Sequence, residues 1–157
     1  MTPDLKYQPG TSYLQTLLLY YEEEISGEAY FYGLAEHSSE PDKMILLGRI
    51  ERHAAMAVES LLEKYGLKPR DENTLAQEGL GHVALHQSYS WRQFMSYIVE
   101  RYPLYLDDFN ALKQMAPVED RDALQRLTDH EIVVIDFAKQ ELAGNTDSLA
   151  TLRRYLD

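Results

Sequence analysis

The chain contains no cysteine. That absence excludes disulfide bonds, thiolate zinc sites, iron–sulfur clusters and thiol nucleophiles, so any metal ion must be held by carboxylates, imidazoles, phenols or water. Long apolar runs are also missing, because no stretch of roughly 18 apolar residues is present. The opening MTPDLKYQPG has neither the basic start nor the apolar core of a signal peptide. We therefore expect a cytoplasmic protein with no membrane partner.

Basic residues are scarce, with 15 Lys and Arg against 26 Asp and Glu and a formal net charge of −11. Nucleic-acid binding requires a basic stripe that neutralises phosphates, so we expect no nucleic-acid partner. Neither a glycine-rich phosphate loop nor a recognisable nucleophilic triad is present. What the chain does have is 157 residues of which 45% are hydrophobic, which predicts one domain spanning residues 1–157.

Apolar residues recur three and four positions apart along most of the chain, which is the pattern of one helix face. No strand is indicated. Helices are predicted at about residues 11–37, 39–66, 90–115, 118–144 and, as a short last helix, 148–156, with an extended arm over residues 1–10 and a crossover connection over residues 67–89 where the periodicity is lost. Short, long and short connections between four long helices predict an all-α antiparallel four-helix bundle.

Three of the predicted helices carry one glutamate inside the apolar stripe, namely Glu28, Glu51 and Glu131. An ionised carboxylate loses several kcal/mol when it leaves water, so a buried acid is normally paired, protonated or bound to a metal. The three glutamates are therefore candidate metal ligands.

Three interpretations of the acids need no metal. Residues 22–24 are three consecutive glutamates, and we interpret them as a solvated face even though Glu24 can be written into the apolar stripe. Arg101, if it points inward, can pair with Asp108 or Glu28 and neutralise part of the cluster. Crowded acids can also stay protonated, because like charges raise each other's pKa.

His82 and His86 are four residues apart, so a helix would place both on one face as a metal-binding pair. The neighbouring Gly79 and Gly81 weaken the prediction of a helix there. A surface or packing role is therefore the favoured interpretation of these histidines.

Three stretches of the sequence, EEEISGEAYFYGLAEH, LLGRIERHAAMAVESLLEKYG and LTDHEIVVIDFAKQELAG, resemble helices 1, 2 and 4 of the ferritin-like superfamily, particularly its small rubrerythrin-like members. The resemblance covers about residues 11–144. It implies a ferritin-like bundle with a dinuclear iron or manganese centre held by Glu28, Glu51, Asp108 and Glu131, with Asp108 as the best candidate on the third long helix. His130, next to Glu131, would join these ligands if its helix is distorted. It also implies an oxidoreductase acting on O₂, peroxide or a small molecule.

The sequence departs from this superfamily at two positions. Dinuclear sites of the superfamily use Glu-x-x-His on helices 2 and 4, whereas this chain has Ala54 and Val134 in place of those histidines. Carboxylates alone bind Mn²⁺ or Mg²⁺ and hold Fe²⁺ less tightly. The alternative is a metal-free ferritin-like scaffold that serves as a dimerisation or partner-binding module. We expect a homodimer, because a small bundle with 12 tyrosines has apolar surface left over.

Overall fold

A computed structural model describes residues 12–157, and its elements are helices joined by short connections. The predicted all-α class is confirmed, since this part of the chain contains no strand. The long helices are α1 (Tyr13–Ala35), α2 (Pro41–Ala57), α5 (Trp91–Met115) and α6 (Arg121–Leu142), and the shorter elements are α3 (Glu59–Lys64), α4 (Glu72–Gly81), α7 (Ala150–Leu156) and the 3₁₀ turns η1 (Val83–Leu85) and η2 (Val118–Asp120). None of the helices described for residues 12–157 combines the length and apolar character needed to cross a membrane.

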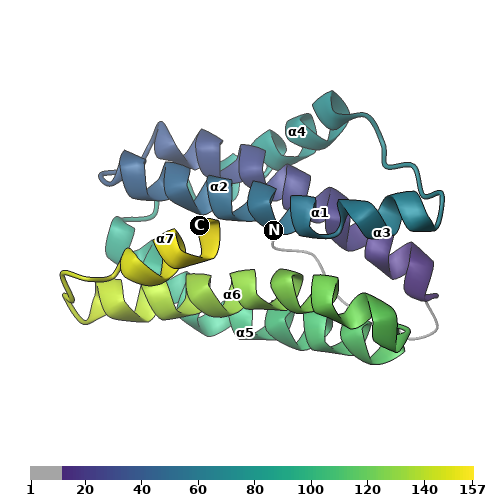
Figure 1. Cartoon of the computed structure of the whole chain (residues 1–157). Coiled ribbons are helices and arrows are strands. Elements are labelled where there is room, and N and C mark those ends of the chain that lie inside the picture. Colours follow the sequence, from purple (N-terminus) through teal and green to yellow (C-terminus); the bar gives the residue numbers. More distant parts are fainter. Residues whose placement is uncertain (1–11) are drawn as a thin grey trace.

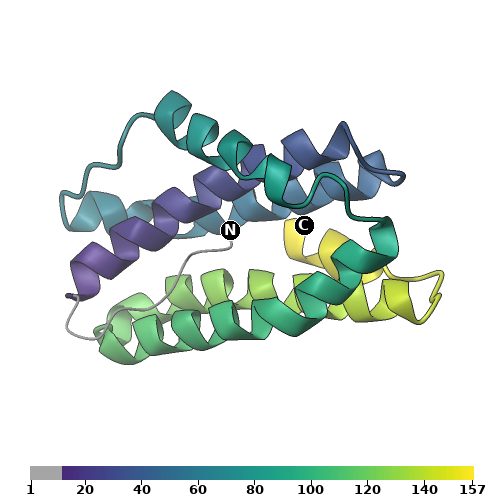
Figure 2. The ribbon, with the colours of Figure 1, turned by 180° about the vertical axis from the view of Figure 1, so that it is seen from behind.

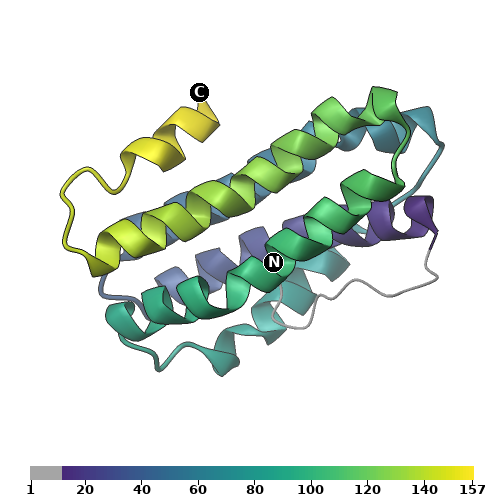
Figure 3. The same cartoon turned by 90° about the horizontal axis from the view of Figure 1, so that it is seen from below.

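The long helices form two antiparallel pairs, α1 with α2 and α5 with α6, which stack on each other (Figure 1). Helix α4 crosses the outer face of α1, on the side away from the second pair (Figure 2). Helix α7 folds back along α6 and also contacts α2 (Figure 3). The apolar core therefore lies between the two pairs.

The helix ends follow local signals in the sequence. The Ser12 hydroxyl accepts a hydrogen bond from the backbone N–H of Gln15 and caps α1. Ser90 and Gln93 form a reciprocal capping box at the start of α5, with distances of 3.1 and 2.8 Å. Gly66 and Gly144 follow helix ends with φ values of 64° and 74°, a region that favours glycine.

Two features of the fold differ from the sequence prediction. The second long helix is interrupted at Val58, whose φ of −110° and ψ of 3° separate α2 from α3. The crossover at 67–89 contains α4, a helix with only Leu75 and Gly79 buried, so no apolar stripe revealed it. Its start is capped by Asp71. The expected arm, residues 1–10, lies outside the described residues.

Helix α4 packs closely on α1 through Gly79. A Cβ atom at this position would overlap the carbonyl oxygen of Ser26. The Ser26 hydroxyl in turn donates to the Leu75 carbonyl at 2.9 Å. The glycine therefore lets the two backbones approach, which is a packing role.

We expect Gly79→Ala to lower the free energy of unfolding by about 1–3 kcal/mol, because the added methyl group overpacks a backbone contact that cannot move aside freely. Urea unfolding followed by circular dichroism measures the effect. Gly81→Ala is the matched control, since a Cβ there meets nothing within 4 Å. Equal stabilities for the two variants would show that the α1–α4 contact is looser than described.

Candidate metal centre

Three ionisable side chains from three helices meet in the core. Glu24 of α1, Glu51 of α2 and His130 of α6 each offer one ligand atom, and these atoms lie within 4.8 Å of one another. The residues are 0%, 2% and 0% exposed, respectively. Nε2 of His130 is 3.0 Å from Oε2 of Glu24 and 2.9 Å from Oε2 of Glu51. This group is positioned to hold a metal ion.

The His130 ring is oriented by contacts on its other sides. Its Nδ1 contacts the carbonyl oxygen of Leu127, one turn earlier in α6. A carbonyl only accepts, so Nδ1 carries a hydrogen and Nε2 is the atom that faces the carboxylates. Phe109 of α5 packs against the ring with centroids 5.3 Å apart. An imidazole whose Nδ1–H donates to a backbone carbonyl and whose Nε2 faces acids has the orientation of a metal-ligating histidine.

Burial and mutual charge shift the pKa values of these groups. Burial, together with the charge of Glu51, raises the pKa of Glu24 to about 8. Burial alone would lower the pKa of His130, but the carboxylates of Glu24 and Glu51 raise it well above its usual value. The pKa of Glu51 is lowered although burial opposes the shift, and His130 is among the groups that stabilise its carboxylate. Without a metal ion the group is thus an imidazolium between two carboxyl groups.

Glu131 adds a third acid beside this group. It is 1% exposed, as its predicted place in the apolar stripe implies. Burial raises its pKa well above the usual value; His130 opposes the shift, and the charges of Glu51 and Glu24 add to it. Neither carboxyl oxygen of Glu131 has a hydrogen-bond partner among residues 12–157. A buried carboxyl group in this condition is costly and would be stabilised by a cation.

The structure brings together some of the predicted ligands and replaces another. Glu51 and His130 meet, while Glu28 does not join them because its carboxylate accepts hydrogen bonds from Arg52 at 2.8 to 3.2 Å. The glutamate that α1 contributes to this group is Glu24, one turn earlier, and Glu28 lies outside the group. Asp108 is half-buried on α5 and is not part of the metal-competent group found among residues 12–157.

The interpretation of residues 22–24 as a solvated face is wrong for Glu22 and Glu24, which are both buried, whereas Glu23 is half-buried. The Glu22 carboxylate accepts hydrogen bonds from Arg70. The available signal was heptad spacing, because Leu17 and Phe31 lie seven residues to either side of Glu24 and all three are at most 1% exposed. The metal-free pairing through Arg101 is not found either, since Arg101 is exposed and the partner of Glu28 is Arg52.

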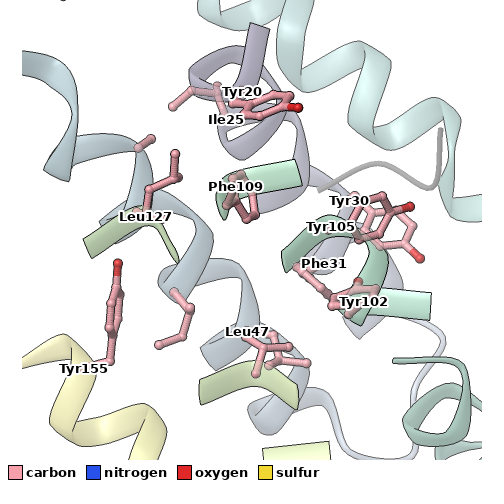
Figure 4. Close-up of a cluster of buried hydrophobic side chains, with 14 of the residues drawn as sticks. Tyr20, Ile25, Tyr30, Phe31, Leu47, Tyr102, Tyr105, Phe109, Leu127 and Tyr155 are labelled. Carbon is pink, nitrogen blue, oxygen red and sulfur yellow. The ribbon is translucent and has the colours of Figure 1, made fainter. Parts of the chain in front are cut away.

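Helix α7 covers one side of the centre. The Tyr155 hydroxyl donates to the Arg126 carbonyl at 2.9 Å. Burial raises the pKa of Tyr155 to about 12, and the charges of His130, Glu24 and Glu51 act on it as well. Figure 4 shows the Tyr155 ring rising from α7 toward Leu127 of α6. The C-terminal helix therefore helps to keep water from the acids.

The stability of the metal-free protein should fall as the pH rises from about 4.5 toward 8. The pKa of Glu24 is raised from 4.5 to about 8, so folding favours its protonated form. This stabilisation is fully present below the unfolded-state pKa of 4.5 and is lost as the pH rises through the folded-state pKa of about 8. The raised pKa of His130 acts in the same direction. Urea midpoints of chelator-treated protein across this range measure the trend.

Glu24→Gln is the control for this pH dependence, because the amide keeps the shape and removes one titrating group. Its urea midpoint should vary less with pH over the same range. A midpoint of the unmodified chain that rises between about pH 5 and pH 8 would contradict the assigned protonation states.

The donor set of the centre, one imidazole and at least two carboxylates, suits a divalent first-row transition metal better than carboxylates alone would. Comparisons of the chain with protein-family models, with curated proteins and with solved structures found no match.

Proposed function

We propose that the protein is a metal-binding protein of the ferritin-like kind, with its centre built by Glu24, Glu51 and His130. The observation that carries the proposal is the convergence of three fully buried donors within 4.8 Å. A divalent cation there would offset the desolvation of the acids, which hydrogen bonds within the described residues leave partly unsatisfied.

The chemistry of the donors favours iron or manganese. His130 supplies an imidazole that the sequence pattern lacked at positions 54 and 134, which strengthens the case for Fe²⁺ relative to a carboxylate-only site. Glu131 supplies a further carboxylate on the next residue of α6, so a second ion would lie on its side and make the centre dinuclear. A redox-active ion bound here would exchange electrons with O₂, peroxide or a small molecule, which is the proposed oxidoreductase activity.

The arrangement of the helices supports the ferritin-like part of the proposal. Two antiparallel pairs, α1 with α2 and α5 with α6, are joined by a long segment that includes α4. This is the short, long and short order of connections found in four-helix bundles with one crossover. Ligands from both pairs then face a shared interior, as in carboxylate-bridged centres.

Metal analysis tests the proposal. Protein expressed in iron- and manganese-supplemented medium should contain about one or two ions per chain by mass spectrometry, and chelator-treated protein should rebind them with release of protons. Glu24→Gln should lose this binding, whereas Glu28→Gln, a change on the same helix outside the centre, should keep it. Less than about a tenth of an ion per chain, with no binding on titration, would remove the proposal.

A metal-free scaffold is the second candidate, and one observation favours it. The His130 imidazolium already compensates part of the acidic charge, so the core is closed without an added ion. Large apolar side chains such as Met56, Leu104 and Val118 are more than half exposed and could serve a homodimer or a partner. In that case Glu24→Gln would leave the biological activity intact, and sedimentation would show a dimer.

A further inference from the structure

A second buried cluster, outside the metal centre, joins a phenol to an imidazole. The Tyr30 hydroxyl lies 2.6 Å from Nδ1 of His86. Tyr30 is 1% and His86 7% exposed. Burial lowers the pKa of His86, and His82 adds to that shift, so the imidazole is neutral and its Nδ1 accepts the phenol hydrogen.

Further aromatic rings connect this pair to the core and to the surface. The His86 ring centroid is 4.4 Å from that of Tyr97 and 5.0 Å from that of Tyr89. Tyr97 is 6.2 Å from Tyr102, and Tyr102 is 5.4 Å from Tyr105. We call Tyr30, His86, Tyr89, Tyr97, Tyr102 and Tyr105 the aromatic chain.

The aromatic chain has one end in the core and one at the surface. Burial raises the pKa of Tyr102 well above its usual value, and the charges of Tyr30, Glu131 and Glu51 add to the shift. Figure 4 shows Tyr30, Tyr102 and Tyr105 gathered on one side of the core. At the other end Tyr89 is 40% exposed and, with Tyr97, lines a surface groove.

A buried phenol gives up an electron readily only if a base takes its proton, because the oxidised phenol is a strong acid. Most acceptors in a protein core cannot do this. The Tyr155 hydroxyl, for example, donates to a peptide carbonyl, which does not accept a proton. The Tyr30 hydroxyl instead faces a neutral imidazole, the side chain best suited to proton transfer near neutral pH.

We propose that Tyr30 and His86 form a redox-active pair, in which Tyr30 is oxidised by one electron while its proton moves to His86, and that the aromatic chain conducts the oxidising equivalent to the groove at Tyr89. The electron goes to a strong one-electron oxidant, the O–H bond of Tyr30 breaks, and an N–H bond forms at Nδ1 of His86. The products are a neutral tyrosyl radical and an imidazolium. An electron from a small organic reductant at the groove then reduces the tyrosyl radical, and the reductant is left oxidised by one electron. The N–H bond at Nδ1 of His86 breaks as its proton returns, and the O–H bond of Tyr30 forms again.

The source of the oxidant in the cell rests on the proposed function, because a redox metal and peroxide would generate it at the centre. The ability of Tyr30 and His86 to undergo this coupled oxidation and proton transfer does not depend on the metal. It can therefore be tested on the full chain after chelator treatment, with azidyl radicals from pulse radiolysis as the oxidant. Tyrosyl radical is followed by its absorbance and by electron paramagnetic resonance of rapidly frozen samples.

The unmodified chain should form a persistent tyrosyl radical, more slowly in D₂O than in H₂O. Tyr30→Phe should abolish the persistent signal. His86→Asn should slow its formation about 100-fold, the lower end of what a positioned proton acceptor contributes. Tyr155→Phe is the matched control, a buried phenol without a base, and should leave yield and rate unchanged.

Persistence of the same radical in Tyr30→Phe, or equal rates in H₂O and D₂O, would overturn the pair. If circular dichroism shows that His86→Asn does not fold, the Tyr30→Phe variant and the comparison of rates in H₂O and D₂O test the proposal without it. A failure here leaves the metal analysis untouched, because no metal is present. If the Tyr30 radical forms but the protein takes up no iron or manganese, the Tyr30–His86 proposal stands and the proposed metal-binding function is contradicted.

Discussion

His130→Ala should lower the free energy of unfolding by about 3–5 kcal/mol, because it leaves buried carboxyl groups without their positive partner. Glu24 and Glu51 are both within 3.0 Å of Nε2 in the folded protein. The same change should abolish binding of iron and manganese, since it removes the only imidazole of the metal-competent group described for residues 12–157. Urea unfolding and isothermal titration of chelator-treated protein measure the two effects.

His53→Ala is the matched control for this variant. His53 also carries an imidazole on a helix that contributes to the centre, but its ring packs against Tyr155 instead of the acids. We expect a loss of about 1 kcal/mol and unchanged metal binding. If both histidine variants lost metal binding equally, the centre would not be where the three side chains converge.

Phe109→Ala should cost about 3–5 kcal/mol, as expected for removing a buried aromatic ring. Phe109 is 1% exposed and contacts Tyr20 edge to face, with centroids 5.4 Å apart. Because it also packs on His130, the cavity would free the imidazole to turn away from the acids. We therefore expect weaker metal binding as well as lower stability, measured by the same two methods.

Two further variants separate packing from orientation. Phe109→Leu keeps most of the volume and should lose less stability than the alanine variant while weakening metal binding measurably. Leu104→Ala removes a side chain of the same helix that is 55% exposed, and should change neither property appreciably. Unchanged metal affinity in Phe109→Ala would show that the Leu127 carbonyl alone orients His130.

The elements of the fold were largely predictable because their signals are local. Ser12 and Ser90 cap helices, and Gly66 and Gly144 follow helix ends, through contacts within a few residues. Helix α4 was missed because it buries only two residues and is held by the close approach of Gly79 to α1. No periodicity within residues 67–89 reports such a contact.

The candidate site was only partly predictable because its composition depends on partners far along the chain. Whether Glu24 or Glu28 faces the core is decided by Arg52, which holds Glu28 at the edge. His130 was predicted to reach the site only if its helix were distorted, yet α6 is one continuous helix. No distortion is needed, because the acids that His130 meets lie on α1 and α2 and are not its own neighbour Glu131. The apolar stripe of a helix shows which face is buried, but residues one turn apart share that face. Glu24 and Glu28 are one turn apart, so the stripe alone does not choose between them.

The candidate centre draws on both helix pairs, and this would determine when, during synthesis of the chain, the proposed ion could bind. A growing chain that has produced only α1 and α2 presents Glu24 and Glu51 without the imidazole of α6. We expect such an intermediate to bind a transition-metal ion more weakly than the folded protein, because the imidazole is missing. In the proposed function, loading of the ion therefore follows translation of α6 and docking of the second pair.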